Sequence, residues 1–169
     1  HGIAADVLGG WQVSGIGDYE GGFPFGVIDN FAGINGYNRP NIVPGTKIKT
    51  YNYGAVKDYF VGRSAKPPVM FTTNAFALTP SPYVLGNGIR AYSGLRTPPL
   101  RNESFSAMKS FRWGEKATGT LRVDYFNAFN RTQFSGPDSD MSDSTFGTVT
   151  GEYSQITNRQ GQATFRIDF

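Results

Sequence analysis

Carboxylate side chains are most closely spaced near residue 140, where Asp138, Asp140 and Asp143 lie in the segment Pro137-Asp-Ser-Asp-Met-Ser-Asp. Oxygen-rich loops can hold Ca²⁺, but a calcium loop normally needs more ligands and a glycine at a fixed position. Asp and Ser are also typical of solvated turns, because their side chains bond the local backbone. We therefore interpret this segment as a turn and not as a metal site.

Other catalytic arrangements are difficult to build from this sequence. His1 is the only histidine and the chain has no cysteine, so an internal Ser–His or Cys–His pair cannot form. A histidine-based metal cluster is excluded for the same reason. Gly15, Gly17 and Gly21 resemble a loose phosphate-binding fingerprint, but they lie in a predicted strand with no helix after it. We predict no catalytic residue, no cofactor and no metal, and we expect that the chain is not an enzyme.

The composition favours strands and turns over helices. The 169 residues include 22 glycines, 15% of them are aromatic, and only 17% are charged. Thr, Tyr, Phe and Val recur while helix-forming residues are sparse, which predicts an all-β fold. The net charge of +3 is spread along the chain. Without a basic cluster, we do not expect nucleic acid as a partner.

Four segments alternate apolar and polar residues with a period of two, at 11–20, 104–113, 118–130 and 160–169. In the last and most regular segment, one face carries Ala163, Phe165, Ile167 and Phe169. In the first, one face carries Trp11, Val13, Gly15, Gly17 and Tyr19. Such alternation predicts strands with one face in an apolar medium and the other in water or a polar interior.

The connections between these segments differ greatly in length. The second and third segments are separated by the four residues 114–117, which is the size of a hairpin turn. The stretch 23–103 is rich in proline and glycine and reads as one long irregular loop, because prolines at this density exclude central strands and long helices. About thirty residues rich in Ser, Asp, Thr and Gly separate the third and fourth segments.

Short turns that alternate with long connections are typical of outer-membrane β-barrels, which have short periplasmic turns and long extracellular loops. If the chain ends in the periplasm, the four strands run alternately up and down. The four-residue turn then falls on the periplasmic side and both long connections fall outside the cell. No stretch approaches the ~18 consecutive apolar residues of a transmembrane helix. We expect an antiparallel segment of a barrel, with a soluble two-sheet sandwich as a weaker alternative.

Several motifs in consistent order resemble the C-terminal end of TonB-dependent outer-membrane receptors of the type with carboxypeptidase-regulatory-like N-terminal domains. The matching stretches are Leu8-Gly-Gly-Trp-Gln-Val-Ser-Gly-Ile16, Gly22-Phe-Pro-Phe25, Asn38-Arg-Pro-Asn41, Val43-Pro-Gly45, Asn74-Ala-Phe-Ala77, Gly94-Leu-Arg-Thr-Pro98 and Tyr125-Phe-Asn-Ala-Phe-Asn130, with Phe134 and Phe146-Gly147 behind. The resemblance implies roughly the last four strands of a plugged barrel of about 22 strands. It implies energised uptake of a bulky nutrient, with the plug and the TonB-contacting segment outside this sequence.

The resemblance also implies an assembly signal, in which a terminal aromatic residue follows apolar residues at alternate positions. Those residues would be Ala163, Phe165, Ile167 and Phe169; the alternative is an ordinary amphipathic strand that ends a soluble sheet.

Aromatic residues near strand ends or on apolar faces fit the interface girdles of barrels, although core packing in a sandwich would also explain them. This set is Trp11, Tyr19, Trp113, Tyr125 and Phe129.

Four strands cannot close a barrel, so their open edges need partners. In one hypothesis the partners are the remaining strands of an intact transporter in the bacterial outer membrane, with outer-membrane lipid and the barrel-assembly machinery as further partners. In the other, copies of this chain add edge to edge into an extracellular fibre or oligomer with a structural role. In either case the ligand is unknown.

The assembly signal can be tested by substitution. Phe169→Ala in the full-length protein is expected to lower its level in the outer membrane, because the terminal aromatic of the signal is removed. Quantitative blotting of outer-membrane fractions measures this. Unchanged levels would contradict the interpretation of Phe169 as part of an assembly signal.

Overall fold

The computed structural model describes residues 8–30, 39–114, 116–153 and 158–169. The chain divides into two compact units. Unit 1 comprises His1–Glu20, Leu100–Thr132 and Gln155–Phe169, and unit 2 comprises Gly21–Pro99 and Gln133–Ser154. The strands pair antiparallel in both units, which confirms the predicted all-β fold.

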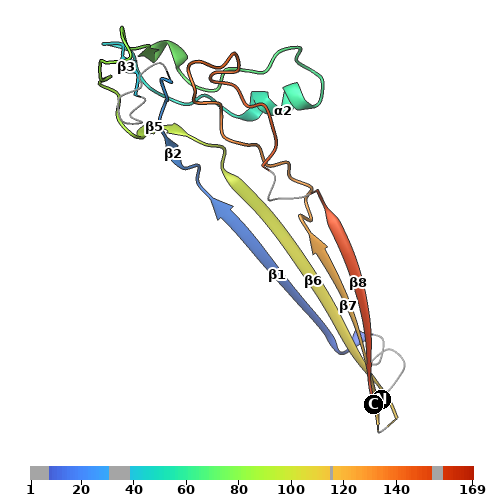
Figure 1. Cartoon of the computed structure of the whole chain (residues 1–169). Helices are drawn as coiled ribbons and strands as arrows, with labels where there is room; N and C mark the ends of the chain where they lie inside the picture. The colour runs from blue at the N-terminus through green and yellow to red at the C-terminus, as the bar shows by residue number, and fades with distance from the viewer. Residues whose placement is uncertain (1–7, 31–38, 115, 154–157) are drawn as a thin grey trace. The chain divides into compact units, whose positions relative to one another are not determined.

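Unit 1 is a single four-stranded antiparallel sheet (Figure 1). Its strands are β1 (Trp11–Glu20), β6 (Leu100–Trp113), β7 (Ala117–Phe126) and β8 (Gln160–Asp168), in the order β1-β6-β7-β8. Each pair is antiparallel, so the short β6–β7 turn lies at one end of the sheet and both long connections leave from the other end. This is the arrangement of turns and connections that the sequence predicts.

The bounds of two strands differ from those predicted. Strand β6 begins at Leu100 and not at 104, because Leu100–Glu103 pair with the last residues of β1. Strand β7 ends at Phe126 and not at 130, because Asn127 and Asn130 have positive φ angles that turn the chain out of the extended conformation. The other two strands lie within one residue of their predicted bounds.

Unit 2 gives local structure to the stretch that we expected to be an irregular loop. It contains β2 (Pro24–Phe25) paired with β5 (Tyr92–Arg96), and β3 (Asn41–Ile42) paired with β4 (Phe76–Ala77). It also contains α2 (Gly54–Phe60) and a 3₁₀ turn, η1 (Thr73–Ala75). These elements are short, as the prolines predict. Among the described residues, no helix has the length and apolar content to cross a bilayer.

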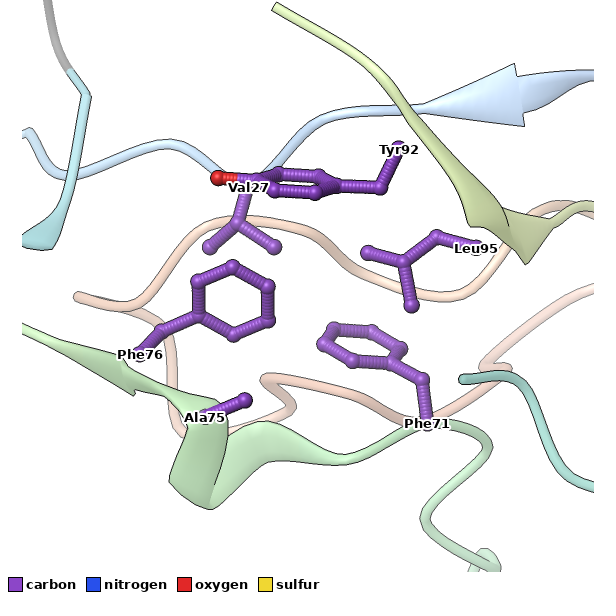
Figure 2. Packing of buried hydrophobic residues seen from close by; sticks show 6 residues of the cluster. All are labelled: Val27, Phe71, Ala75, Phe76, Tyr92 and Leu95. Atoms are coloured by element: carbon purple, nitrogen blue, oxygen red, sulfur yellow. The ribbon is translucent and has the colours of Figure 1, made fainter. Parts of the chain in front are cut away.

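Unit 2 has a hydrophobic core of its own (Figure 2). The Phe71 ring is fully buried and meets the rings of Phe25, Phe76 and Phe146 edge to face, at centroid distances of 5.5, 6.3 and 5.4 Å. Figure 2 shows Val27, Ala75, Tyr92 and Leu95 around the Phe71 and Phe76 rings. Edge-to-face aromatic contacts add to the free energy gained by burial. The connection is therefore a packed body, because residues distant in sequence converge on Phe71.

The two long connections are joined within unit 2. Val56 of α2, Met70 and Val149 form a second buried cluster. The Met70 amide donates a 2.7 Å hydrogen bond to the Gly147 carbonyl, which ties the first connection to the second.

Asp29 is also fully buried, and its Oδ2 accepts hydrogen bonds from the Thr79 amide and hydroxyl at 2.7 and 3.0 Å.

The core of unit 2 predicts the effect of removing its central ring. Phe71→Ala should cost about 3–5 kcal/mol, because it removes apolar burial and leaves a cavity. Phe23→Ala in the same unit should cost less than about 0.5 kcal/mol, because Phe23 is 65% exposed. Native-state hydrogen exchange of the full-length protein would report faster exchange of the Tyr51 amide, which bonds the Met70 carbonyl, in the first variant only. Equal exchange in the two variants would contradict this account of the core.

Candidate functional site

The register of unit 1 gives its sheet two chemically different faces. Odd-numbered residues of all four strands share one face and even-numbered residues share the other. We call the odd-numbered face the apolar face. Its described apolar side chains are Trp11, Val13, Tyr19, Phe105, Ala107, Phe111, Leu121, Val123, Tyr125, Ala163, Phe165 and Ile167. The even-numbered face, here the polar face, is dominated by Ser, Thr, Gln, Asp and Arg.

The apolar face is exposed and not part of a core. Val13 is 73% exposed, Phe165 53% and Ile167 48%. All the buried hydrophobic side chains in the described residues belong to unit 2, whereas the buried side chains of unit 1 are the polar Glu103, Asp124 and Asn127. A water-soluble sheet buries its apolar face against a second layer. The sheet of unit 1 instead presents that face to its surroundings.

Aromatic rings from neighbouring strands pack against glycines on the apolar face. Gly15 lies opposite Phe105, and Gly119 lies opposite Phe111. A Cβ atom on Gly119 would lie only 2.4 Å from the Phe111 ring, and one on Gly15 would lie 3.0 Å from the Phe105 ring. Gly161 is placed in the same way beneath the Tyr125 ring, at 3.2 Å. Rings that lie flat over cross-strand glycines cover backbone and widen the continuous apolar surface.

A polar cluster marks the end of the apolar face from which the long connections leave. The Tyr19 hydroxyl donates a 2.7 Å hydrogen bond to Glu103 Oε1. Arg131 Nε donates to both carboxylate oxygens of Glu103, at 3.2 and 2.9 Å. The Asn127 side chain positions Arg131, because its Oδ1 accepts from the Arg131 amide at 2.8 Å and its Nδ2 donates to the Arg131 carbonyl at 3.1 Å. Glu103 is thus buried with its charge compensated.

The same end carries aromatic rings in contact with arginines. The Arg131 guanidinium lies 5.5 Å from the centroid of Phe129, and the Arg159 guanidinium lies 5.8 Å from that of Tyr125. Phe129 in turn meets Phe105 edge to face at 6.0 Å. The hydrogen bonds to Glu103 raise the pKa of the Arg131 guanidinium. The structure therefore brings together three of the five predicted interface aromatics, namely Tyr19, Tyr125 and Phe129.

Of the other two predicted interface aromatics, Trp113 lies next to the β6–β7 turn, whereas Trp11 lies opposite Lys109 of β6. Trp11 begins β1 and Trp113 ends β6; the side chain of Trp113 is outside the described residues. The Lys109 amine, the one charge in the middle of the apolar face, lies 5.3 Å from the Trp11 ring centroid. A long lysine stem can lie along an apolar surface while its amine finds a favourable site. This contact explains how Lys109 is accommodated among apolar residues.

The residues of the predicted assembly signal lie on one strand and one face. Ala163, Phe165 and Ile167 lie on the apolar face of β8, opposite Val123, Leu121 and Gly119 of β7. Phe165 stacks on Phe111 of β6 with a centroid distance of 6.0 Å. Phe169 follows the strand and is fully exposed. Whether these residues act in assembly stays a prediction.

The polar face carries a hydrogen-bonded row across three strands. Ser106, Asp124 and Gln162 lie side by side in the register of β6, β7 and β8. Gln162 Nε2 donates to Asp124 Oδ2 at 3.1 Å, and Arg122 lies 2.9 Å from Asp124 Oδ1. Arg166 and Asp168 form a second ion pair of 2.7 Å along β8. The row gives this face the hydrogen-bonding capacity of a surface that contacts water.

The aspartates near residue 140 make local turn contacts. Asp138 accepts hydrogen bonds from the Asp140 amide at 2.9 Å and the Thr145 hydroxyl at 2.6 Å. Asp140 accepts from the amide and hydroxyl of Ser142. These are the bonds of turn-forming aspartates. Within the described ranges, no three His, Cys, Asp or Glu residues are grouped as a metal site. Gly15 and Gly17 lie inside β1, so they form no phosphate-binding turn.

The pattern of residues along the chain does not reveal the polar cluster of Tyr19, Glu103 and Arg131. Extending the alternation of β6 back from Phe105 would have placed Glu103 on the apolar face, which is an unusual position for a carboxylate. Its partner Arg131 lies beyond the end of β7, and no periodicity connects the two. The aromatic–glycine pairs were also missed, because they are visible only once the register is known.

Comparisons with known proteins identify the family. The outer membrane beta barrel domain family matches residues 1–162, which is nearly the whole chain. No curated protein and no solved structure matches the chain. The match agrees with the exposed apolar face, the antiparallel order and the alternation of one short turn with long connections. The chain belongs to the outer membrane beta barrel domain family and is part of a barrel-type membrane protein of the bacterial outer membrane.

Proposed function

We propose that the chain forms part of the wall and the external loops of a TonB-dependent transporter, which takes up a bulky nutrient without catalysing a reaction on it. The observation that carries this proposal is the single-layer sheet of unit 1, with one exposed apolar face and one polar face. In a transporter barrel the apolar face contacts lipid and the polar face lines the lumen. The order of motifs that resembles these receptors supports the finer assignment.

The dimensions of the sheet suit this placement. Strands β1, β7 and β8 contain 10, 10 and 9 residues, which is the length of a tilted membrane-spanning strand. From Phe105 to Trp113 the apolar face of β6 rises about 26 Å at ~3.3 Å per residue. A tilt of ~40° reduces this to about 20 Å along the membrane normal, close to the ~25 Å apolar band of outer-membrane barrels.

The folded long connections support a role in capture of a large solute. In the proposed orientation the β6–β7 turn is periplasmic and unit 2 is built from extracellular loops. Unit 2 holds its own buried core, so these loops have a defined surface. Loops positioned by a rigid scaffold commonly carry binding function. A folded body of this kind can present a fixed surface to a bulky ligand.

A fibre or oligomer built by edge-strand addition is a second candidate. Within the described residues, β1 and β8 each pair with one strand only, so each presents an edge to a further strand. Mass measurement of the intact particle separates the two candidates. A single large polypeptide extracted by detergent supports the transporter. Repeating copies of this chain along a detergent-free filament would contradict it.

The lipid-facing assignment predicts different effects for adjacent substitutions. Val13→Arg should destabilise the full-length protein in bilayers by about 2–4 kcal/mol, because it places a charge on the lipid-facing side near the middle of the membrane. Ser14→Arg, one residue further on and on the polar face, should have an effect near zero. Urea unfolding in lipid vesicles measures both. Equal destabilisation by the two substitutions would show that the apolar face does not face lipid.

Transport itself can be tested in cells that contain the full-length gene. Labelled pools of oligosaccharides and oligopeptides should include a species that accumulates only when the gene is present. The accumulation should stop when a protonophore collapses the proton gradient, because TonB-dependent uptake is energised. Accumulation that is insensitive to the protonophore, or identical in cells without the gene, would contradict the proposed function.

A further inference from the structure

We propose that the apolar face binds the phosphate groups of an outer-leaflet lipid through Arg101, Arg131 and Arg159. These residues lie at the end of the face from which the long connections leave. This inference rests on the proposed orientation, in which the apolar face contacts lipid and that end lies in the outer leaflet. It goes beyond nutrient uptake, because it concerns a lipid held on the outside of the barrel wall.

The three arginines converge on one end of the apolar face from separate chain segments. Arg101 lies on this face near the start of β6, opposite Tyr19 of β1. Arg131 follows β7 and is bonded to Glu103. Arg159 directly precedes β8 and lies over the Tyr125 ring. Three segments, β6, the residues after β7 and the residue before β8, therefore each bring a guanidinium group to this end of the face.

The local charge is positive and accessible. Glu103 is the one carboxylate among the described residues of this face, and it is paired with Arg131. Three guanidinium groups against one carboxylate leave a net charge of about +2. The nearby carboxylates of Asp18 and Glu20 lie on the polar face of β1. All three arginines are exposed, and the Arg131 side chain keeps 41% of its surface accessible although it pairs with Glu103.

The shape of the surface identifies the class of ligand. The arginine row is continuous with the apolar band, which begins at Phe105 and Tyr125. A soluble anion would use the arginines alone, whereas a lipid uses both parts, with its chains on the band and its headgroup at the arginines. Guanidinium groups bind phosphate oxygens with paired hydrogen bonds. The rings of Tyr19 and Phe129 lie at the same end of the sheet as the arginines, and in a barrel this is the level where lipid headgroups meet acyl chains.

The test uses full-length protein purified in detergent and titrated with diphosphorylated lipid A, with bound lipid counted by native mass spectrometry. The double variant Arg101→Gln and Arg159→Gln leaves the Arg131–Glu103 pair intact. We expect its affinity to fall by about fivefold for each arginine removed, which is ~25-fold in total. Arg159→Gln alone should lower it about fivefold, and provides a second readout if the double variant assembles poorly.

The matched control is Arg112→Gln with Arg166→Gln, which removes the same charge from the polar face. This variant should bind lipid A as the unsubstituted protein does, and lipid A stripped of its phosphates should bind weakly to every form. Unchanged affinity in the Arg101 and Arg159 variants, an equal loss in the control, or equal binding of the dephosphorylated lipid would overturn the proposal. Because binding is measured without transport, failure here is distinct from failure of the proposed uptake.

Discussion

The structure depends on one constraint, which is that a sheet one layer thick cannot hide an apolar face from its surroundings. Water would penalise the exposed Val13, Phe165 and Ile167 side chains, whereas hydrocarbon would not. Hydrocarbon offers no hydrogen bonds, so the backbone must pair strand to strand without interruption, as it does from β1 to β8. The same constraint explains why the buried side chains of unit 1 are polar and the buried apolar ones lie in unit 2.

The cluster of Tyr19, Glu103 and Arg131 follows from this constraint. A carboxylate on a lipid-facing surface is tolerated near the interface and only when it is compensated. Glu103 meets both conditions, since it lies beyond the apolar band and bonds to a hydroxyl and a guanidinium. Lys109 lies deeper, and there the Trp11 ring contacts its amine. Each of these two charges on the apolar face thus has a compensating contact, Glu103 with Arg131 and Lys109 with the Trp11 ring.

The sequence was informative where one residue's environment is set by its own strand. The regular alternation of Ala163 to Phe169 located β8 because each side chain responds only to its face. Prediction from the sequence failed at Leu100–Glu103, where apolar Leu100 lies on the polar face and charged Arg101 and Glu103 lie on the apolar face. It also failed at Asn127, where a positive φ ends β7 although the alternating pattern continues. The core of unit 2 could not be predicted, because Phe71, Leu95 and Phe146 come from distant segments without periodicity.

The central claim is that odd-numbered residues of the sheet face lipid and even-numbered ones face an aqueous lumen. Residues 1–169 contain no cysteine. Single cysteines can be introduced along β7 and spin-labelled in the reconstituted full-length protein, after any cysteine outside these residues has been replaced. Labels at Leu121, Val123 and Tyr125 are expected to be relaxed by oxygen, which partitions into lipid. Labels at Thr120, Arg122 and Asp124 should instead be relaxed by a water-soluble nickel chelate. A scan without this period of two, or with nickel access on both faces, would contradict the account.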